Sequence, residues 1–259
     1  MCLLIVAHQS ERRYPLVVAA NRDEFHARPT AAAQFRPEQP DLLAGRDLEQ
    51  GGTWMGITRQ GRFAALTNYR DPAQTAPAPR SRGELPLNYL CGTQDPASYL
   101  HEVARCAAHY AGFNLLVGRP GCLWYFSNSG GPGDNRPQCL APGIYGLSNA
   151  RLDTPWPKVV QGKARLAALL RQAAPDHDAL AGTVGDRRRA ERGALVGLDM
   201  HSAMDQLLSA QFIVTAQYGT RSTTTGWIDH RGGVNWRELS FDASGALSGV
   251  QEATFDLVR

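Results

Sequence analysis

The first 25 residues read MCLLIVAHQSERRYPLVVAANRDEF, and this stretch contains the pattern that decides the fold. Two apolar runs, Cys2 to Ala7 and Leu16 to Ala20, are separated by the polar segment His8 to Arg13. Short apolar runs joined by a polar connection are typical of a β-hairpin. We therefore expect Cys2 to begin a strand, and the polar residues Asn21 to Glu24 to follow the strand that pairs with it.

The rest of the chain predicts strands at both ends with helices between them. Further strands are expected at Thr53 to Ile57, Phe63 to Thr67, Phe113 to Val117, Leu123 to Ser127, Gly143 to Ser148, Phe212 to Ala216, Thr223 to Asp229, Asn235 to Phe241 and Ala253 to Val258. Helices are expected from Asp95 to Gly112, after Pro155, over Asp178 to Val184 and over Ser202 to Leu208, and loops at Asp71 to Arg82 and Gly130 to Pro137. This order favours an α+β fold in which helices cover antiparallel sheets.

The composition is that of a globular protein that can bury a sizeable core. Hydrophobic residues make up 43% of the 259 residues and charged residues 20%, so we expect one domain over residues 1–259. The net charge of +3 is too small to indicate a nucleic-acid or membrane-surface partner. The basic run of Arg187, Arg188, Arg189 and Arg192 has no interleaved aromatic residues, so a solvated helix face or loop is expected there.

The cysteines favour a reducing compartment. Their number, five, is odd, and they lack the paired spacing of a zinc site, so neither a disulfide framework, a metal nor another cofactor is predicted. The first residues lack the charge order of a secretory signal, and no apolar window reaches the length of a membrane span. We therefore expect a soluble cytoplasmic protein, whose oligomeric state the sequence leaves undetermined.

The main functional hypothesis concerns Cys2. Removal of the methionine before it would leave a thiol and a free α-amino group on one residue. An α-amine titrates at about 7.7 to 8.0, so it can accept the thiol proton without a histidine. The alternative is that Cys2 is a small apolar residue at the start of a buried strand. The polar residues at the ends of other strands favour the nucleophile.

Those polar residues include charged and amide side chains. Arg22 near the thiol would lower its pKa, and Asp23 could orient the ammonium of residue 2, whereas the alternative is a surface Arg–Asp turn. Asn68 and Asn149 each end a strand and offer the neutral donors that a tetrahedral oxyanion needs. Taken singly, each asparagine is typical of a turn.

Arg221 lies between two predicted strands, among glycine and hydroxyl residues. It could bind a substrate carboxylate or support the nucleophile, or it could be a structural arginine that holds a bulge. The residues alone leave these alternatives open. The Pro-rich loop Asp71 to Arg82 follows Asn68 closely, which suggests the hypothesis that this loop closes over the site.

Several short motifs occur in order along nearly the whole chain. They are Met1-Cys2, Ala19-Ala20-Asn21-Arg22-Asp23-Glu24-Phe25 with Arg28-Pro29, Gly51-Gly52-Thr53-Trp54-Met55-Gly56, Ala65-Leu66-Thr67-Asn68-Tyr69, Arg82-Gly83-Glu84-Leu85, Gly112-Phe113-Asn114-Leu115, Tyr145-Gly146-Leu147-Ser148-Asn149, Thr154-Pro155-Trp156 and Tyr218-Gly219-Thr220-Arg221. Together they resemble the NRDE family, the family of the transport and Golgi organisation protein 2 type.

The NRDE family is similar to the N-terminal-nucleophile hydrolases, including the bile-salt hydrolase and penicillin V acylase branch. The resemblance implies a four-layer αββα sandwich with Cys2 as nucleophile. It implies that Asp23 holds the amine of Cys2 and that Asn68 and Asn149 are the oxyanion asparagines. Arg221 resembles the late arginine that supports the nucleophile in that branch.

The predicted function is hydrolysis of a small amide or acyl substrate through a thioester on Cys2. Arg22 completes the predicted catalytic set, although the acylases place their early arginine three residues before the aspartate, where this chain has Ala20. Substrate contacts are expected from Asn21, Trp54 and Tyr69.

A second hypothesis follows from the resemblance alone. Members of the family are linked to haem handling and to lipid or acyl-CoA balance, which implies a non-catalytic protein that binds and carries haem or a lipid or acyl ligand. The seven histidines are scattered, and no Cys-x-x-Cys-His motif is present, so the residues themselves do not mark a haem site.

Overall fold

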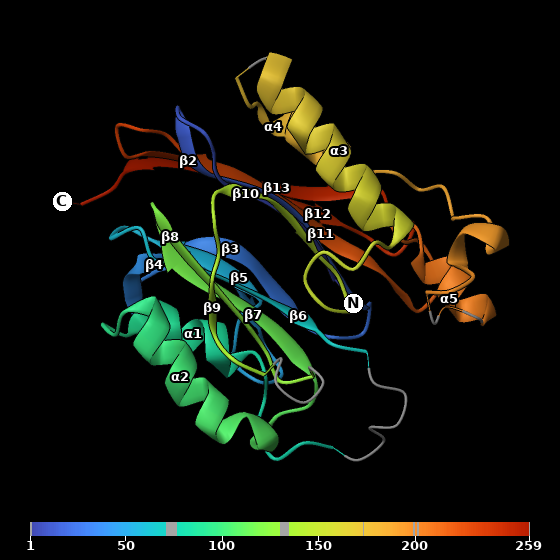
Figure 1. The fold of residues 1–259 in the computed structure, drawn as a ribbon, viewed down its shortest axis with the longest axis horizontal. Helices are drawn as coiled ribbons and strands as arrows, with labels where there is room; N and C mark the ends of the chain where they lie inside the picture. Colours follow the sequence, from blue (N-terminus) through green and yellow to red (C-terminus); the bar gives the residue numbers. More distant parts are fainter. Residues whose placement is uncertain are drawn as a thin grey trace.

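Two antiparallel sheets lie face to face, and helices cover both outer faces (Figure 1). The structure is a computed structural model that describes residues 2–70, 77–129, 135–172, 174–198, 200 and 202–258. The strand order is β10-β1-β2-β11-β12-β13 in the first sheet and β3-β4-β5-β6-β7-β8-β9 in the second. The predicted α+β fold, a four-layer αββα sandwich of two antiparallel sheets between layers of helices, is confirmed.

The strands of each sheet come from both halves of the chain. The first sheet contains β1 (Cys2–Glu11), β2 (Tyr14–Phe25), β10 (Gly143–Leu147), β11 (Tyr218–Ile228), β12 (Gly233–Phe241) and β13 (Leu247–Asp256). The second sheet contains β3 (Thr30–Arg36), β4 (Gln39–Asp47), β5 (Met55–Thr58), β6 (Phe63–Asn68), β7 (Phe113–Arg119), β8 (Cys122–Ser127) and β9 (Gln138–Cys139).

The helices form the two outer layers. On the second sheet lie α1 (Glu84–Cys91) and α2 (Pro96–Cys106), and on the first lie α3 (Pro157–Gln172) and α4 (His177–Thr183). The short helix α5 (Ala203–Leu208) and the 3₁₀ turns Ala107–His109 and Arg192–Leu195 complete the helical segments of the described residues. Helix α2 begins as predicted, because the Asp95 side chain accepts a hydrogen bond from the Ser98 amide and Pro96 occupies the first turn.

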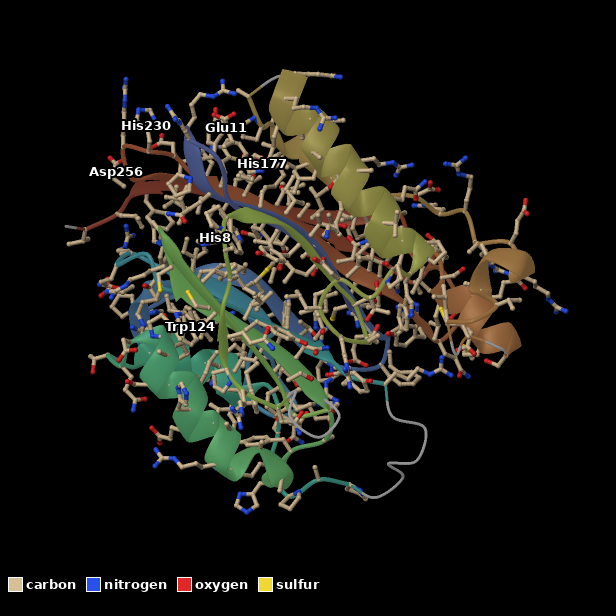
Figure 2. All side chains as sticks on the ribbon, in the orientation of Figure 1. His8, Glu11, Trp124, His177, His230 and Asp256 are labelled. Carbon is tan, nitrogen blue, oxygen red and sulfur yellow. The ribbon has the colours of Figure 1, made fainter. Side chains whose placement is uncertain are left out.

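Alternation along β1 assigns its side chains to two different cores. Leu4 and Val6 join the core between the sheets, whereas Leu3 and Ile5 pack under α3. Side chains fill the space between these layers (Figure 2). Because side chains alternate with a period of two, Cys2 shares the face of Leu4 and its thiol faces the second sheet.

The predicted N-terminal hairpin is confirmed, and its register brings the site residues together. In the β1–β2 pair, Cys2 is opposite Arg22 and Leu4 is opposite Ala20. The second predicted hairpin is also confirmed as β5 and β6, with Met55 opposite Ala65. Cys2 therefore lies at the same end of the first sheet as the polar residues that follow Ala20.

Some sequence predictions were wrong or incomplete. The hairpin of β3 and β4 was not predicted, because charged residues and register shifts interrupt its alternation of apolar and polar residues. The helix α1 was not predicted, because Pro86 lies within it. No strand forms at Phe212 to Ala216. The backbone amide of Phe212 donates to the carbonyl of Asp186 (2.9 Å), and only an isolated bridge joins Val214 to Gly219.

Parts of two predicted loops, residues 71–76 and 130–134, lie outside the described residues. Within the described ranges, none of the helices is both long enough and apolar enough to cross a membrane.

Candidate active site

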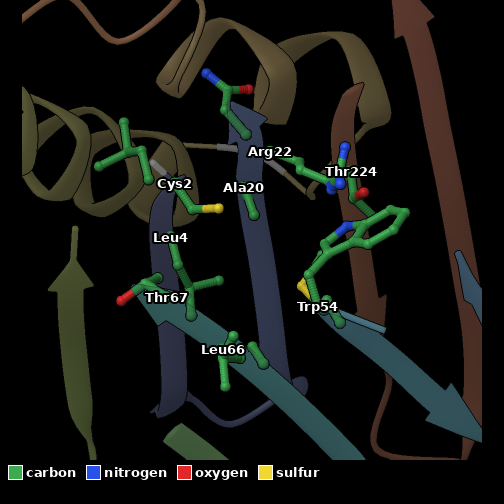
Figure 3. Close-up of a pocket in the computed structure, with 12 residues that line it drawn as sticks. Cys2, Leu4, Ala20, Arg22, Trp54, Leu66, Thr67 and Thr224 are labelled. Atoms are coloured by element: carbon green, nitrogen blue, oxygen red, sulfur yellow. The ribbon is translucent and has the colours of Figure 1, made fainter. Parts of the chain in front are cut away.

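The side chain of Cys2, at the start of β1, borders two small cavities, and Figure 3 shows one of them. Its backbone is fixed by the hydroxyl of Ser148, which donates to the Cys2 carbonyl (2.9 Å). Cys2 and Arg22 come from adjacent strands of the first sheet, while Leu66 lies on β6 of the facing sheet and Trp54 directly precedes β5. The cysteine thus stands between the sheets, where a ligand could reach it.

The two cavities differ in chemistry. The smaller one, of about 20 Å³, is apolar for most of its surface and is lined by Cys2, Leu3, Leu4, Ala20, Asn21, Arg22, Trp54, Met55, Ala65, Leu66, Thr67 and Thr224. The larger one, of about 120 Å³, is polar and is lined by Cys2, Arg22, Asp23, Glu24, Arg28, Asp47, Thr53, Trp54, Leu66, Asn68, Ser81, Arg82 and Gly83. Cys2 borders both, so a bound molecule could present an apolar group on one side of the thiol and a polar group on the other.

Arg22 is the buried cation nearest the cysteine in the strand register. Arg22 is 6% exposed, and its guanidinium stacks on the Trp54 ring at 4.4 Å from the ring centre. The Nη2 atom is 4.0 Å from the Glu24 carboxylate, which is beyond hydrogen-bond distance. The Nη1 atom is buried and has no hydrogen-bond partner among the described residues.

Asp23 lies on the opposite face of β2, as strand alternation requires. It is 1% exposed, and its Oδ1 accepts a hydrogen bond from the Thr220 hydroxyl (2.7 Å). Burial raises the pKa of Asp23, and the positive charge of Lys158 opposes this shift. Burial lowers the pKa of Lys158, whose Nζ donates to the carbonyl of Leu208 (2.9 Å). An acid and a base are therefore buried together behind the strand end.

Burial also raises the pKa of the Cys2 thiol above its usual value of 9.0. The negative charge of Asp23 adds to the increase, while the positive charge of Arg22 opposes it. At neutral pH the thiol is therefore protonated and needs a base before it can act as a nucleophile.

The two asparagines at strand ends have different environments. Asn68 lines the larger cavity together with Cys2. Asn149 is 1% exposed, lines neither cavity, and donates through its side-chain amide to the backbone carbonyl of Asn68 (2.7 Å). Asn149 therefore holds the end of β6, and only Asn68 borders the space in front of the thiol.

Arg221 lies in a bulge of β11 and away from the cavity linings. Thr220 pairs with Asp23 and Ser222 pairs with Arg22, so Arg221 has no partner across the strand pair. Its Nη1 donates to the backbone carbonyls of Phe25 (3.0 Å), His26 (3.1 Å) and Arg28 (3.2 Å). These contacts support the alternative in which Arg221 is a structural arginine that holds the bulge and the following loop.

The three residues that were predicted to contact the substrate lie in different environments. Trp54 borders both cavities. The Asn21 side chain donates to the carbonyls of Val184 (2.7 Å) and Gln211 (2.9 Å) and accepts from the Thr223 hydroxyl, so it ties β2 to the helical side. Tyr69 lines neither cavity, and its amide donates to the carbonyl of Gly112 (2.9 Å).

Sequence reasoning did not assign Lys158 or Arg82 to the site. Lys158 is one of two lysines in the amphipathic helix α3, so no local signal marks it. Arg82 follows the Pro-rich segment and lines the larger cavity, with its Nη1 donating to the Gly112 carbonyl (3.0 Å). Its place in the Arg82-Gly83-Glu84-Leu85 motif was the only signal. Within the described residues, no group of three or more His, Cys, Asp or Glu side chains is arranged to hold a metal ion.

The chain is thus an α+β sandwich with a cysteine at a strand end between its two sheets. The chain matches the family described as Transport and Golgi organisation 2 over residues 1–243. A homologue from Homo sapiens is 37% identical over 247 residues, which covers 89% of this chain and 88% of the relative. A homologue from Mus musculus is 36% identical with the same coverage. The chain belongs to the Transport and Golgi organisation 2 family, so the predicted NRDE resemblance is confirmed.

Solved structures with a similar layered arrangement include two hydrolases. The C2A mutant of the conjugated bile acid hydrolase from Clostridium perfringens matches with a TM-score of 0.44 and 11% identity over 99% of this chain and 92% of that chain. The Caenorhabditis elegans orthologue of N-acylethanolamine-hydrolyzing acid amidase matches with a TM-score of 0.39 and 10% identity over 86% of this chain and 92% of that chain.

Proposed function

We propose that this protein is a hydrolase that cleaves a small amide or acyl substrate through a thioester on Cys2. The observation that carries the proposal is the position of the Cys2 side chain, which borders both cavities at the strand end opposite Arg22. The proposal includes removal of Met1, so that Cys2 carries a free α-amine.

The α-amine supplies the base that the thiol needs. It takes the thiol proton, and the resulting thiolate attacks the carbonyl carbon of the substrate to give a tetrahedral oxyanion. Collapse of this intermediate breaks the bond to the leaving group, which receives the proton from the α-ammonium. Water then attacks the thioester with the same amine as base, so the acid product leaves and the thiol is restored.

Neighbouring residues support these steps through their placement. Arg22 stabilises the thiolate through its positive charge, which already opposes the rise of the thiol pKa. Asp23 is close enough to Cys2 in the strand register to attract the α-ammonium, and Thr220 orients its carboxylate. Asn68 borders the cavity in front of the thiol and is the candidate donor to the oxyanion, while Asn149 holds it in place.

The cavity volumes favour a small substrate. The larger cavity is about 120 Å³, whereas pockets for drug-sized ligands are roughly 300 to 1,000 Å³. The alternative, a carrier for haem or for a lipid or acyl ligand, would therefore require the sheets or loops around Cys2 to move apart.

The test is an intact-mass measurement on the purified protein before and after exposure to p-nitrophenyl acetate, followed by peptide mapping. We expect Met1 to be absent and an acetyl group to form on Cys2 and then to be released with turnover. Cys2→Ala should abolish this reaction, while Cys91→Ala, which removes an exposed cysteine, should leave it unchanged.

The outcomes separate the two functions. Retention of Met1 together with the absence of acetylation at Cys2, under conditions that acetylate Cys91, would refute the hydrolase. Stoichiometric haem or fatty-acyl binding that survives Cys2→Ala, without turnover, would favour the carrier.

A further inference from the structure

The larger cavity contains cations whose hydrogen-bonding capacity is only partly used. Three arginines border it, Arg22, Arg28 and Arg82. Arg28 is neutralised, because its Nη2 bonds to Asp47 (2.6 Å) and its Nη1 is 3.4 Å from Glu49. Arg22 approaches a carboxylate only at 4.0 Å, that of Glu24, and Arg82 forms no ion pair within the described residues.

Arg22 has a buried guanidinium nitrogen that lacks a hydrogen-bond acceptor among the described residues. The residue is more than nine-tenths buried, it borders both cavities, and its Nη1 has no hydrogen-bond partner in the described part of the chain. A buried N–H group without an acceptor is costly, because it has lost its hydrogen bond to water without replacing it. An anionic ligand in the cavity would supply the missing acceptor.

Arg82 approaches the same space from the segment before α1. Among the described residues, one of its guanidinium nitrogens, Nη1, donates to a protein acceptor, the Gly112 carbonyl. Three carboxylate residues line the cavity, and none is within hydrogen-bond distance of Arg22 or Arg82 in the contacts between described residues. Asp47 is bonded to Arg28, Asp23 accepts from the Thr220 hydroxyl, and the Glu24 carboxylate stays 4.0 Å from Arg22. Two guanidinium groups on separate elements therefore face one polar cavity beside the thiol.

We propose that the larger cavity binds a small carboxylate of the substrate between Arg22 and Arg82, with the reacting acyl group beside Cys2 over the apolar cavity. Guanidinium groups match the planar carboxylate through paired hydrogen bonds. The smaller cavity, of about 20 Å³, restricts the acyl side to a short apolar group. The assignment of the acyl group rests on the proposed function, whereas the carboxylate site does not.

A pair of alkylating reagents tests the carboxylate site without requiring catalysis. Iodoacetate and iodoacetamide are nearly equal in size, and each transfers its CH₂ carbon to a thiolate with loss of iodide, but only iodoacetate carries a carboxylate. The quantity to measure is the ratio of their alkylation rates at Cys2, by peptide mass spectrometry. The exposed cysteines Cys91 and Cys139 serve as references in the same protein.

We expect the iodoacetate to iodoacetamide ratio at Cys2 to exceed that of the references by about ten-fold or more, as charge-assisted hydrogen bonds imply. Arg82→Gln should lower this ratio toward the reference value, and Arg22→Gln should do the same if circular dichroism shows that it folds. Glu24→Gln should raise the ratio, because it removes a competing negative charge. Arg12→Gln, an exposed arginine at the hairpin turn, is the matched control and should leave the ratio unchanged.

A free α-ammonium on Cys2 would also attract iodoacetate, so the change caused by Arg82→Gln decides the question. A ratio at Cys2 that equals the references, or that Arg82→Gln does not change, would overturn the proposal. Failure of both reagents to reach Cys2 would overturn it as well, because the site must admit an anion up to the thiol. Acetylation of Cys2 without a preference for iodoacetate would support the hydrolase but not the carboxylate site. A preference for iodoacetate without acetylation of Cys2 would support the carboxylate site but not the hydrolase.

Discussion

Gly52→Ala is expected to damage the site from outside the cavity linings. Gly52 precedes β5 and its backbone lies against that of Gly83, at the start of α1. A Cβ atom at position 52 would lie 2.4 Å from the carbonyl carbon of Gly83 and 2.6 Å from its oxygen. These are backbone atoms, so no side-chain rotation can relieve the contact.

The two segments would have to separate by about 1 Å to restore ordinary contact distances. The displacement would strain the hydrogen bond from the Thr53 amide to the Gly83 carbonyl, which is now 3.0 Å. Overpacking together with a weakened buried hydrogen bond predicts a loss of about 2 to 4 kcal/mol in the free energy of unfolding. Trp54 and Arg82 lie next to these segments, so the alkylation rate at Cys2 should change as well.

Urea unfolding followed by circular dichroism measures the loss of stability. Gly51→Ala is the matched control, because Gly51 has a φ of 75° and no atom within 4 Å of an added Cβ. Its cost is therefore the left-handed backbone alone, about 1 to 2 kcal/mol, with no change at Cys2. The reasoning would be refuted if Gly52→Ala unfolded within 0.5 kcal/mol of the unchanged protein, a difference typical of neutral surface substitutions.

Three further substitutions follow from buried polar groups. Asn21→Ala removes the donor to two buried carbonyls, and the free energy of unfolding in urea should fall by about 2 to 4 kcal/mol. Glu238→Gln should stabilise the protein increasingly as pH rises. Burial raises the pKa of Glu238 above 4.5, so the folded state binds this proton more tightly than the unfolded chain does. The unchanged protein therefore loses stability as pH rises from 4.5 through the folded pKa, and the glutamine variant avoids this loss. Equal effects in urea at pH 5 and pH 8 would contradict this. Thr220→Val removes the hydroxyl that donates to Asp23 and should cost about 1 to 2 kcal/mol at pH 7 in the same assay, with a smaller loss at pH 5, where a larger share of this carboxyl is protonated.

Part of the candidate site could be predicted from the sequence because it depends on local strand geometry. The hairpin pattern of residues 2–25 places Cys2 near Arg22, since a short connection leaves little freedom in register. Trp54 and Asn68 flank the second hairpin, and both border the larger cavity as the packed sheets bring them to Cys2.

The remaining parts of the site depended on packing between distant segments. A bulge in β11 moves Arg221 out of the pairing, and nothing in the local residues shows where one extra residue enters a strand. Asn149 uses its amide on the carbonyl of Asn68 only because the ends of β6 and β10 approach each other in the sandwich. Lys158 was not predicted, because a lysine in a helix is usually exposed.

The sequence by itself determined the order of strands and helices, the N-terminal hairpin and the family, because these depend on local periodicity and on motifs along the chain. The tertiary structure alone decided which polar side chains face the thiol. Strand alternation directs the Arg22 side chain between the sheets and the Asp23 carboxylate toward Thr220, although both residues border the larger cavity. Docking of the segment before α1 brings Arg82 to the same cavity. The physical reason is that burial and hydrogen-bond partners come from segments far apart in the chain, and only the packed sheets bring them within reach of one another.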